Sequence, residues 1–479
     1  MTAPFNTETH PLNQTWPRQA LEDARRQGLK LYLVGGYVRD ALLNRSGGGV
    51  KDFDFAVVGG SAVAFAETFA TAHGGHFVLL DRNLDTARVV AEDATILDFA
   101  GCMGNTIEQD LHRRDFTVNA LAWDADSPDQ VIDLVGGVED LHQKRIRAIS
   151  EQALVDDPLR VLRAFRFAAA LDAPIEPATR DMIKRHAASL SKVAGERISY
   201  EWFTTMDAPR VGDLVKEMGA TGVLEAIFPE LTAQHKVTSN AYHHLGLFDH
   251  SMEAVAQSEE FLQRAPEFVL SSLSRRDSYA VTRRAATMTA CLLHDIGKPD
   301  TWEITEEGRH TFIGHDKLGA QMNETVAKRL KWSRPIERLI TRLIAAHLRP
   351  GQLYHQGPPT DKAVHRFYRN IGEDTPELIT LAFGDLGATR GPGLEETRGA
   401  LENSLRELLA GYPVFVDSQR KLPKLLDGEQ IMQLLGIKPG RMVGELLEEL
   451  EEAQALKQVT DREEAERFVA DKYREKYAG

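Results

Sequence analysis

Two aspartates one residue apart, Asp52 and Asp54, lie in the alternating segment "KDFDFAVVGG". In an extended strand residues i and i+2 point to the same side, so both carboxylates leave one face and Phe53 and Phe55 the other. Neighbouring carboxylates repel each other unless a cation lies between them. Two Mg²⁺ ions bound by this pair would organise an in-line phosphoryl displacement. One ion would activate an attacking hydroxyl, and the other would neutralise a leaving pyrophosphate.

The segment before the acid pair predicts a companion site for a triphosphate. In "LYLVGGYVRDALL" an apolar run stops at Gly35 and Gly36, and a helical pattern follows. The glycines let backbone amides approach phosphates at the start of the helix, and Arg39 in its first turn can contact a phosphate or a ribose. The motif is neither a Walker A sequence nor G-x-G-x-x-G. For this segment alone, a strand, turn and helix with a surface acid pair is an equally good interpretation.

The elements around these residues predict an α+β head followed by helices. Strand patterns cover residues 29–36, 51–60, 76–81, 86–93 and 94–101, and a helix over 61–75 ends at glycines. Arg113, Arg114 and Asp115 precede what we expect to be an apolar helix. After Ser150 the strand signals stop.

A second polar motif, "DDPLRVLRAFRF", lies in the helical part. It places Asp157 and Arg160 three residues apart, with Arg163 one turn further on. An aspartate and an arginine on one helical face can offer an acceptor and donors to a nucleobase edge, and so select a base without a template. The alternative is a surface ion pair, worth a few tenths of a kcal/mol.

Length, composition and charge narrow the class of protein. A chain of 479 residues predicts three or four domains. It has no apolar run long enough for a transmembrane helix, and its N-terminus lacks a signal-peptide core. Two distant cysteines, Cys102 and Cys291, exclude a disulfide framework and fit a cytoplasmic location. The net charge of −14 argues against a general nucleic-acid binder, yet residues 141–197 carry 11 Lys and Arg against 7 Asp and Glu. This stretch leaves room for a phosphate-rich partner.

Five segments in order resemble the motifs of class II tRNA nucleotidyltransferases and bacterial poly(A) polymerases: "LVGGYVRDALL", "KDFDFAV", "RRDFTVNALA", "DDPLRVLRAFRFA" and "ERISYEW". The resemblance covers residues 29 to 230. It implies a polymerase-β-like head, with Mg²⁺ bound by Asp52 and Asp54 as the catalytic pair. It also implies a tRNA 3′ end and CTP as substrates, with ATP in addition where the full CCA end is built. The implied nucleotide-binding residues are Gly35, Gly36, Arg39, Arg114, Asp157, Arg160 and Arg163, of which Asp157 and Arg160 would read the base.

The chain departs from the family pattern in two places. The base-reading motif usually begins Glu-Asp, whereas this chain has Asp156-Asp157. Family members that add a complete CCA end also carry a flexible loop before the "RRDFT" motif, and "ILDFAGCMGNTIEQDLHRRDF" leaves only a few residues for it. Members without the loop add two cytidines and leave the adenosine to a separate A-adding enzyme. Full CCA addition and CC addition therefore both stand as hypotheses.

Histidines and aspartates after residue 240 suggest a second centre. They occur in "AYHHLGLFDHSMEAV", with His243 and His244, and in "CLLHDIGKPD", "FIGHDKLGA", "IAAHLRP" and "LAFGDLGATRG". Histidine and carboxylate ligands suit a divalent transition metal. The pattern resembles HD-domain phosphohydrolases over residues 240 to 400. The resemblance implies metal ligands at His250, His294, Asp295 and Asp385, with His315 and His347 completing a two-metal site.

The resulting hypothesis is template-independent transfer of CMP, alone or followed by AMP, to a tRNA 3′ end, with phosphohydrolase activity in the HD domain. Poly(A) polymerase is the alternative within the family. An HD hydrolase with an RNA-binding head, or a non-catalytic RNA-binding protein, would belong to other classes. The predicted domains are an arm, a head, a helical neck, an HD domain and a helical tail, at residues 1–28, 29–150, 151–235, 236–412 and 413–479.

Overall fold

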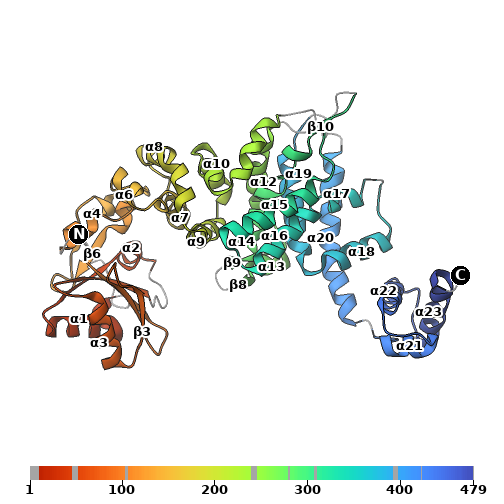
Figure 1. Cartoon of the computed structure of the whole chain (residues 1–479), viewed down its shortest axis with the longest axis horizontal. Helices are drawn as coiled ribbons and strands as arrows, with labels where there is room; N and C mark the ends of the chain where they lie inside the picture. The colour runs from red at the N-terminus through yellow and green to blue at the C-terminus, as the bar shows by residue number, and fades with distance from the viewer. Residues whose placement is uncertain are drawn as a thin grey trace. The chain divides into compact units, whose positions relative to one another are not determined.

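The computed structural model describes residues 10–45, 52–102, 106–238, 245–278, 281–306, 310–355, 357–391, 397–421 and 423–477 (Figure 1). Its contacts divide the chain into two compact units. The first comprises Met1–Ala208 with Glu217–Ile227, and the second Pro209–Lys216 with Phe228–Gly479. None of the helices in the described ranges is both long and apolar enough to span a membrane. The protein is α+β, with one large sheet near the N-terminus and helices over most of the remainder.

The head is built on a seven-stranded sheet of order β3-β4-β5-β2-β1-β6-β7. Strand β2 pairs parallel to β5 and antiparallel to β1, and the remaining neighbours are antiparallel. The strands are β1 (Lys30–Val34), β2 (Asp52–Val58), β3 (His76–Asp81), β4 (Thr86–Val90), β5 (Ile96–Gly101), β6 (Leu121–Asp124) and β7 (Val131–Asp133).

Five helices accompany this sheet: α1 (Thr15–Arg26), α2 (Gly36–Leu42), α3 (Ala62–His73), α4 (Ile107–His112) and α5 (Gly137–His142). Helix α3 begins at Ser61, whose hydroxyl accepts from the Ala64 N–H, and ends at left-handed Gly74, as the sequence predicts. The segment after Asp115 contradicts an expectation, because it forms a short 3₁₀ turn and then β6 in place of an apolar helix. Leu121–Asp124 can pair with β1, and that pairing outweighs its helical pattern.

Six helices follow the head: α6 (Glu151–Asp156), α7 (Arg160–Leu171), α8 (Pro177–His186), α9 (Gly195–Met206), α10 (Val211–Ala220) and α11 (Val223–Ile227). Helix α7 places Phe165 and Leu162 in the core and leaves its arginines on another face. It packs against α9 through buried residues that include Trp202.

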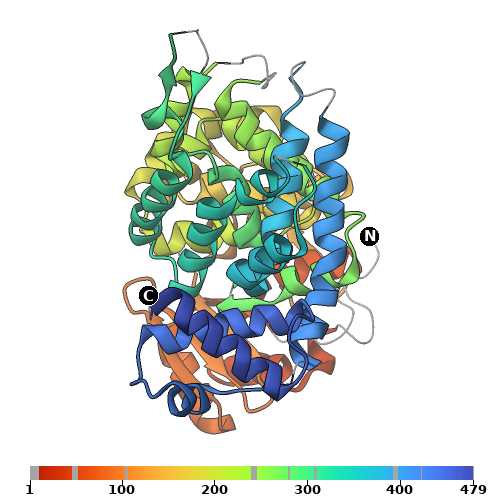
Figure 2. The ribbon, with the colours of Figure 1, turned by 90° about the vertical axis from the view of Figure 1, so that its right-hand side faces the viewer.

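The second unit is helical, with the C-terminal helices α21–α23 packed on one another (Figure 2). Its further helices are α12 (Leu247–Leu262), α13 (Glu267–Ser274), α14 (Arg283–Leu293), α15 (His315–Leu330), α16 (Arg334–Ala346), α17 (Arg349–Leu353), α18 (Asp361–Ile371), α19 (Thr375–Ala388), α20 (Arg398–Lys421), α21 (Gly428–Leu435), α22 (Arg441–Ala455) and α23 (Arg462–Tyr477). The predicted domain boundary at residue 412 falls inside α20.

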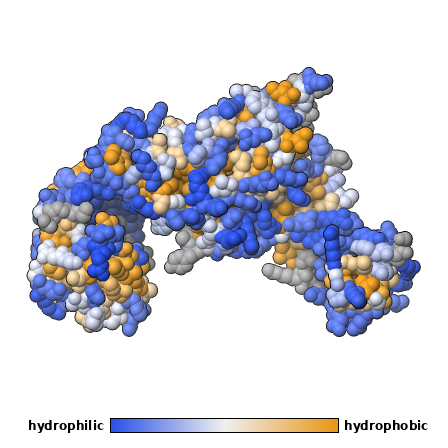
Figure 3. All heavy atoms as spheres, in the orientation of Figure 1, coloured by the Kyte–Doolittle hydropathy of each residue, from blue (hydrophilic) through white to orange (hydrophobic). Residues whose placement is uncertain are grey.

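Two small hairpins in this unit contradict the expectation that strands end at Ser150. They pair β8 (Arg276–Ser278) with β9 (Val281–Thr282), and β10 (Glu303–Ile304) with β11 (His310–Thr311). Strands of two or three residues are too short to leave an alternating pattern in the sequence. The surface drawn in Figure 3 is mostly hydrophilic with scattered apolar patches, which agrees with a charged content of 27%.

Candidate active site and metal clusters

The acid pair lies on the exposed face of β2, as the alternation predicts. Asp52 and Asp54 are exposed, whereas Phe53 and Phe55 are buried. Phe53 packs against Tyr37 of α2, and Phe55 stacks on Phe99 of β5. This aromatic core fixes the strand, so the two carboxylates must project to the opposite side of the sheet.

A third carboxylate, which the sequence analysis missed, stands beside the pair. Asp98 of β5 lies opposite Asp54 in the parallel ladder, so both side chains leave the same face. Its two oxygens accept from Arg88, from Nε at 2.7 Å and from Nη2 at 2.8 Å. The alternation in "TILDFAG" carries the signal, but only the strand register brings Asp98 to Asp54.

The three carboxylates crowd negative charge on this face. Burial, then Asp98 and then Asp52 raise the pKa of Asp54 to about 6, and the nearby Arg114 and Arg88 do not offset them. Burial and Asp98 also raise the pKa of Asp52. A divalent cation such as Mg²⁺ prefers carboxylate oxygens as ligands, and its charge would relieve the repulsion that opposes ionisation of these three acids.

A cavity of about 480 Å³ adjoins Asp54. Gly35 at its edge has a φ of +74°, and a Cβ there would lie 3.4 Å from Nη1 of Arg114 and 3.5 Å from Oδ2 of Asp54. Both distances are ordinary contacts, so it is the positive φ of the turn that favours glycine at this position. Asp52 is not part of the wall. The lining residues are Gly35, Gly36, Arg39, Asp54, Arg114, Asp115, Asn119, Asp157, Arg160, Arg163, Arg166 and Phe167.

A chain of hydrogen bonds holds the arginines on one side of this cavity. Arg39 donates to Asn119 Oδ1 at 2.8 Å, and Asn119 Nδ2 donates to Asp115. Asp115 also accepts from Arg163, whose Nη2 lies 2.7 Å from Oδ2. Burial would raise the pKa of Asp115, but Arg163 and the hydrogen bonds lower it below its ordinary value. Asp115 therefore stays ionised and fixes Arg163.

Glu201 of α9 positions the other side of the arginine group. It is 2% exposed and accepts from Arg163 at 3.3 Å and from Arg166 at 2.5 Å. Both guanidiniums lie over the ring of Phe167, at 5.1 and 4.1 Å from its centroid. Sequence reasoning did not assign Glu201 a role, although it lies within the quoted motif "ERISYEW".

Asp157 and Arg160 both line the cavity, but not as one helical face. Asp157 precedes α7 in an extended conformation, so the expectation that the two share a helix is wrong. Asp157 and Arg160 also do not form the ion pair that was the alternative interpretation. Asp157 Oδ2 accepts from Arg197 at 2.8 Å, and Arg160 Nη1 donates to the carbonyl of Ala153 at 3.1 Å. Pro158 accounts for the break, since the residue before a proline disfavours the helical conformation.

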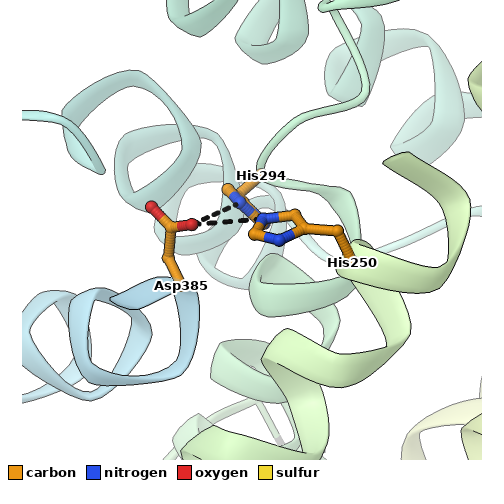
Figure 4. Close-up of side chains that lie close together, drawn as sticks. All are labelled: His250, His294 and Asp385. Carbon is orange, nitrogen blue, oxygen red and sulfur yellow. Dashed lines mark ion pairs between the residues drawn. The ribbon is translucent and has the colours of Figure 1, made fainter. Parts of the chain in front are cut away.

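The second unit brings the predicted metal ligands together from five places in the sequence. His250 of α12, His294 at the end of α14 and Asp385 of α19 form one cluster, and Asp295, His315 and His347 form another. Figure 4 shows His250 and His294 directed at Asp385, with Nε2 atoms 3.1 and 3.6 Å from Oδ1. Within each cluster the donor atoms lie within 4.8 Å of one another. His243 and His244 lie outside the described residues.

Asp295 lies between the two clusters. Its Oδ2 is 3.2 Å from His294 Nε2, and its Oδ1 is 3.3 Å from His315 Nε2 and 3.7 Å from His347 Nε2. A carboxylate with an oxygen toward each cluster can bridge two cations. Lys298, which the sequence analysis did not assign, lies 2.6 Å from Oδ2 of Asp295.

Main-chain carbonyls orient three of the histidines, from helices α14 and α16 for His294 and His347 and from the segment before α15 for His315. Nδ1 of His294, His315 and His347 lies 2.8, 2.7 and 2.6 Å from the carbonyl oxygen three residues earlier. A carbonyl oxygen only accepts, so Nδ1 carries a proton, and Nε2 is the nitrogen that presents a lone pair to the cluster once it is deprotonated. Nε2 of His315 then faces Nε2 of His347 at 3.1 Å. Two lone pairs this close fit a shared cation, which suits a divalent transition metal.

The charges of the clusters agree with this fit. Burial alone would lower the pKa of His294, but Asp295 and Asp385 raise it to about 10. Burial opposes the ionised form of Asp385, yet hydrogen bonds and charge from His250 and His294 hold its pKa well below the usual range. The carboxylates of Asp295 and Asp385 thus require positive charge beside them, which a metal ion would supply in place of protons.

Comparison with known proteins supports each region. Family models match residues 31–147 as a poly(A) polymerase head domain, 174–234 as a probable RNA- and SrmB-binding site of polymerase A, and 247–385 as an HD domain. The A-adding tRNA nucleotidyltransferase of Deinococcus radiodurans is 34% identical over 91% of this chain and 94% of its own length. The CC-adding enzyme of Geobacter sulfurreducens is 33% identical over 94% of this chain and 93% of its own.

Solved structures of CCA-adding enzymes have a similar fold. The solved structure of the Thermotoga maritima CCA-adding enzyme complexed with tRNA covers 95% of this chain and 94% of its own, with a TM-score of 0.65 and 22% identity. The sequence relatives extend over nearly the whole chain at more than 30% identity. The chain therefore belongs to the class II tRNA nucleotidyltransferases, with a poly(A) polymerase-type head, an RNA-binding region and an HD domain.

Proposed function

We propose that the protein adds the two cytidines of the CCA end to the 3′ terminus of tRNA. The observation that carries this proposal is the short connection before the "RRDFT" segment. Only residues 102–106 separate β5 from α4, and residues 103–105 of these lie outside the described ranges. The flexible loop expected of enzymes that add all three nucleotides does not fit into five residues. The CC-adding relative from Geobacter sulfurreducens supports the same assignment.

The residues in and beside the head cavity have different roles in the proposed reaction. Mg²⁺ held by Asp52 and Asp54 would supply charge neutralisation for the triphosphate and would activate the terminal hydroxyl. Arg114, Arg163 and Arg166 line the cavity with fixed positive charge that complements phosphates. Glu201 and Asp115 keep Arg163 and Arg166 in place without neutralising all of their donors, and Asp110 holds Arg114.

Asp157 and Arg160 are proposed to read the base. Arg197 holds Oδ2 of Asp157, which fixes its carboxylate at the cavity wall. In the part of the chain that the structure describes, Arg160 uses Nη1 for the Ala153 carbonyl, so Nε and Nη2 stay available to a base edge. A cytosine presents an N4 donor beside acceptors, which matches one carboxylate and one guanidinium.

The product length on a truncated tRNA tests the proposal. The protein is incubated with tRNA that lacks its CCA end, and with CTP alone, ATP alone or both. We expect two added nucleotides with CTP and no further extension with ATP. Asp54→Asn should abolish addition while tRNA binding persists. Full CCA addition, or long adenosine tails, would refute CC addition, and an active Asp54→Asn variant would refute the proposed metal site.

Addition of the terminal adenosine is the second candidate, because the relative from Deinococcus radiodurans is A-adding and 34% identical. A tRNA that already ends in CC separates the two. Extension of that substrate by one adenosine, without activity on the shorter tRNA, would favour the A-adding function.

We also propose that the HD clusters bind divalent transition metal ions and hydrolyse phosphoesters. The ligands would be His250, His294, Asp295 and Asp385, with His315 and His347. A cavity of about 260 Å³ supports this proposal, because His347, Asp385 and Lys298 line it together with apolar residues such as Leu348 and Leu405. Lys298 would bind a substrate phosphate beside the ions.

The variant His294→Ala separates the two activities. We expect it to lose bound metal and hydrolysis of bis(p-nitrophenyl) phosphate, while nucleotide addition continues. Metal content is measured by elemental analysis of the purified protein. Retained metal with unchanged hydrolysis would refute the HD proposal, and loss of nucleotide addition as well would show that the two centres are not separate.

A further inference from the structure

An arginine-rich cavity of about 240 Å³ lies in the second unit; none of the HD-cluster ligands lines it, and it shares only Leu386 with the HD cavity. Helices α12, α19 and α20 and the residues just after them form its walls. The cavity brings Arg264, Arg390, Arg398 and Arg406 together with two acids, Glu260 and Glu402. Four arginines in one small cavity are unexpected in a chain whose net charge is −14.

The acids neutralise only part of this positive charge. Arg406 pairs with Glu402 at 2.6 Å. Arg390 donates to the carbonyl of Gly387 and to the amide oxygen of Gln257, and these neutral groups orient it without cancelling its charge. After the pair of Arg406 and Glu402 is set aside, three guanidinium groups and the carboxylate of Glu260 remain, so the cavity has a net positive charge.

Arg398 and Arg264 complete the positive group in different ways. Arg398 Nη1 donates to the carbonyl of Thr389 at 3.1 Å. Among the described residues, the exposed side chain of Arg264 has neither a hydrogen bond nor an ion pair. These two and Arg390 therefore keep donors for a ligand with several acceptor oxygens.

An aromatic pair makes the cavity floor rigid. Phe261 of α12 stacks on Phe383 of α19, with centroids 4.2 Å apart and planes 11° from parallel. Arg406 lies over the Phe383 ring, 5.9 Å from its centroid. The stacked rings couple α12 to α19, so the arginines stand on fixed elements and lose little freedom when a ligand binds.

We propose that this arginine cavity is a phosphate-binding site, separate from the head cavity and the HD clusters. Planar guanidiniums bind phosphate through paired hydrogen bonds, and four of them converge here. The ligand is a phosphate group of an RNA backbone or of a free phosphate compound. The proposal concerns binding alone and does not depend on which nucleotide the head adds.

Salt-dependent binding tests this site in the full-length protein. The probes are tRNA that lacks its CCA end and inorganic pyrophosphate, each titrated without nucleotide. The variant R390Q/R398Q removes two charges, and R334Q in α16 is a control with an exposed arginine outside the cavity. Two lost phosphate contacts should lower the slope of log K against log salt by about 1.5. E402Q releases Arg406 from its ion pair and should raise the affinity for the probes, whereas R390Q/R398Q should lower it.

Each outcome bears on the proposal. A lower slope for tRNA in R390Q/R398Q, but not in R334Q, supports the site with RNA as the source of the phosphate. An unchanged slope with the loss of one pyrophosphate site supports it with a free phosphate compound as the ligand. Binding of both probes equal to that of R334Q overturns it. R264Q repeats the test if the double variant unfolds, because among the described residues that exposed side chain has no hydrogen bond or ion pair to lose.

Discussion

A single methyl group added at Gly384 should separate two of the metal ligands. Gly384 precedes Asp385 in α19, where α19 crosses α12, the helix that carries His250. A Cβ at this position would lie 1.9 Å from Oγ of Ser258 and 2.5 Å from the carbonyl oxygen of Ala254. The hydroxyl can rotate away, but the carbonyl is part of the α12 backbone and cannot.

The size of the effect follows from these distances. Ordinary contact begins at 3.4 Å, so the carbonyl must retreat by 3.4 − 2.5 = 0.9 Å. A metal site tolerates about 0.2 Å in its ligand distances, so α12 and α19 would move apart by several times that tolerance. Overpacking of this kind costs about 1–3 kcal/mol of folding free energy. Gly384→Ala should therefore lower stability and also bind less metal.

Denaturant unfolding and elemental analysis measure both effects. Gly444→Ala is the matched control, since a Cβ in this α22 position has no heavy atom within 4 Å. It should stabilise α22 by up to about 1 kcal/mol and leave the metal content unchanged. In a Gly384→Ala background, Ser258→Ala should recover only part of the loss, because the Ala254 carbonyl stays in place. Wild-type stability together with full metal content in Gly384→Ala would refute the reasoning.

Four other perturbations have defined outcomes. The pKa of Asp54 is raised to about 6, and its carboxyl group must lose a proton to bind Mg²⁺. At pH 5 only about a tenth of the protein has this group ionised in the absence of metal. The Mg²⁺ concentration for half-maximal nucleotide addition should therefore rise below pH 6. Asp98→Asn removes the second-largest cause of that shift and should move this rise to lower pH. Asp115→Asn weakens the acceptor of Arg163, and we expect about a tenfold higher KM for the nucleotide in steady-state kinetics, equivalent to about 1.4 kcal/mol. Arg283→Met leaves the fully buried carboxylate of Glu377 without its ion-pair partner and should destabilise the second unit by about 3–5 kcal/mol, as measured by urea unfolding. An unchanged unfolding midpoint would contradict a buried ion pair.

The sequence predicts most readily those parts of the site that depend on local pattern. The two-residue alternation places Asp52 and Asp54 on one face because strand geometry requires it, and the glycines mark the turn before α2. The HD ligands could also be named from their types and local segments, and three of them, His294, His315 and His347, lie at helix ends. The register that sets Asp98 beside Asp54 depends on a parallel pairing between distant strands, which no local pattern encodes.

The errors have a common physical cause. The segment 121–124 has residues that suit a helix, but its pairing with β1 decides its conformation. Asp157 is three residues from Arg160, yet Pro158 breaks the helix between them and turns the carboxylate to Arg197. The role of Glu201 emerges only when α9 packs on α7, because its two arginine partners lie 35 and 38 residues away.

The hydrogen bonds from three HD histidines to carbonyl oxygens of the preceding turn have a consequence for how the site can be lost. The acceptor in each case is main chain, which every amino acid at that position supplies. Replacing the neighbouring side chains therefore leaves the inward-facing nitrogen where it is. The orientation of these ligands depends on main-chain geometry, so it is lost when the histidine itself is replaced or when the backbone segment before it is displaced.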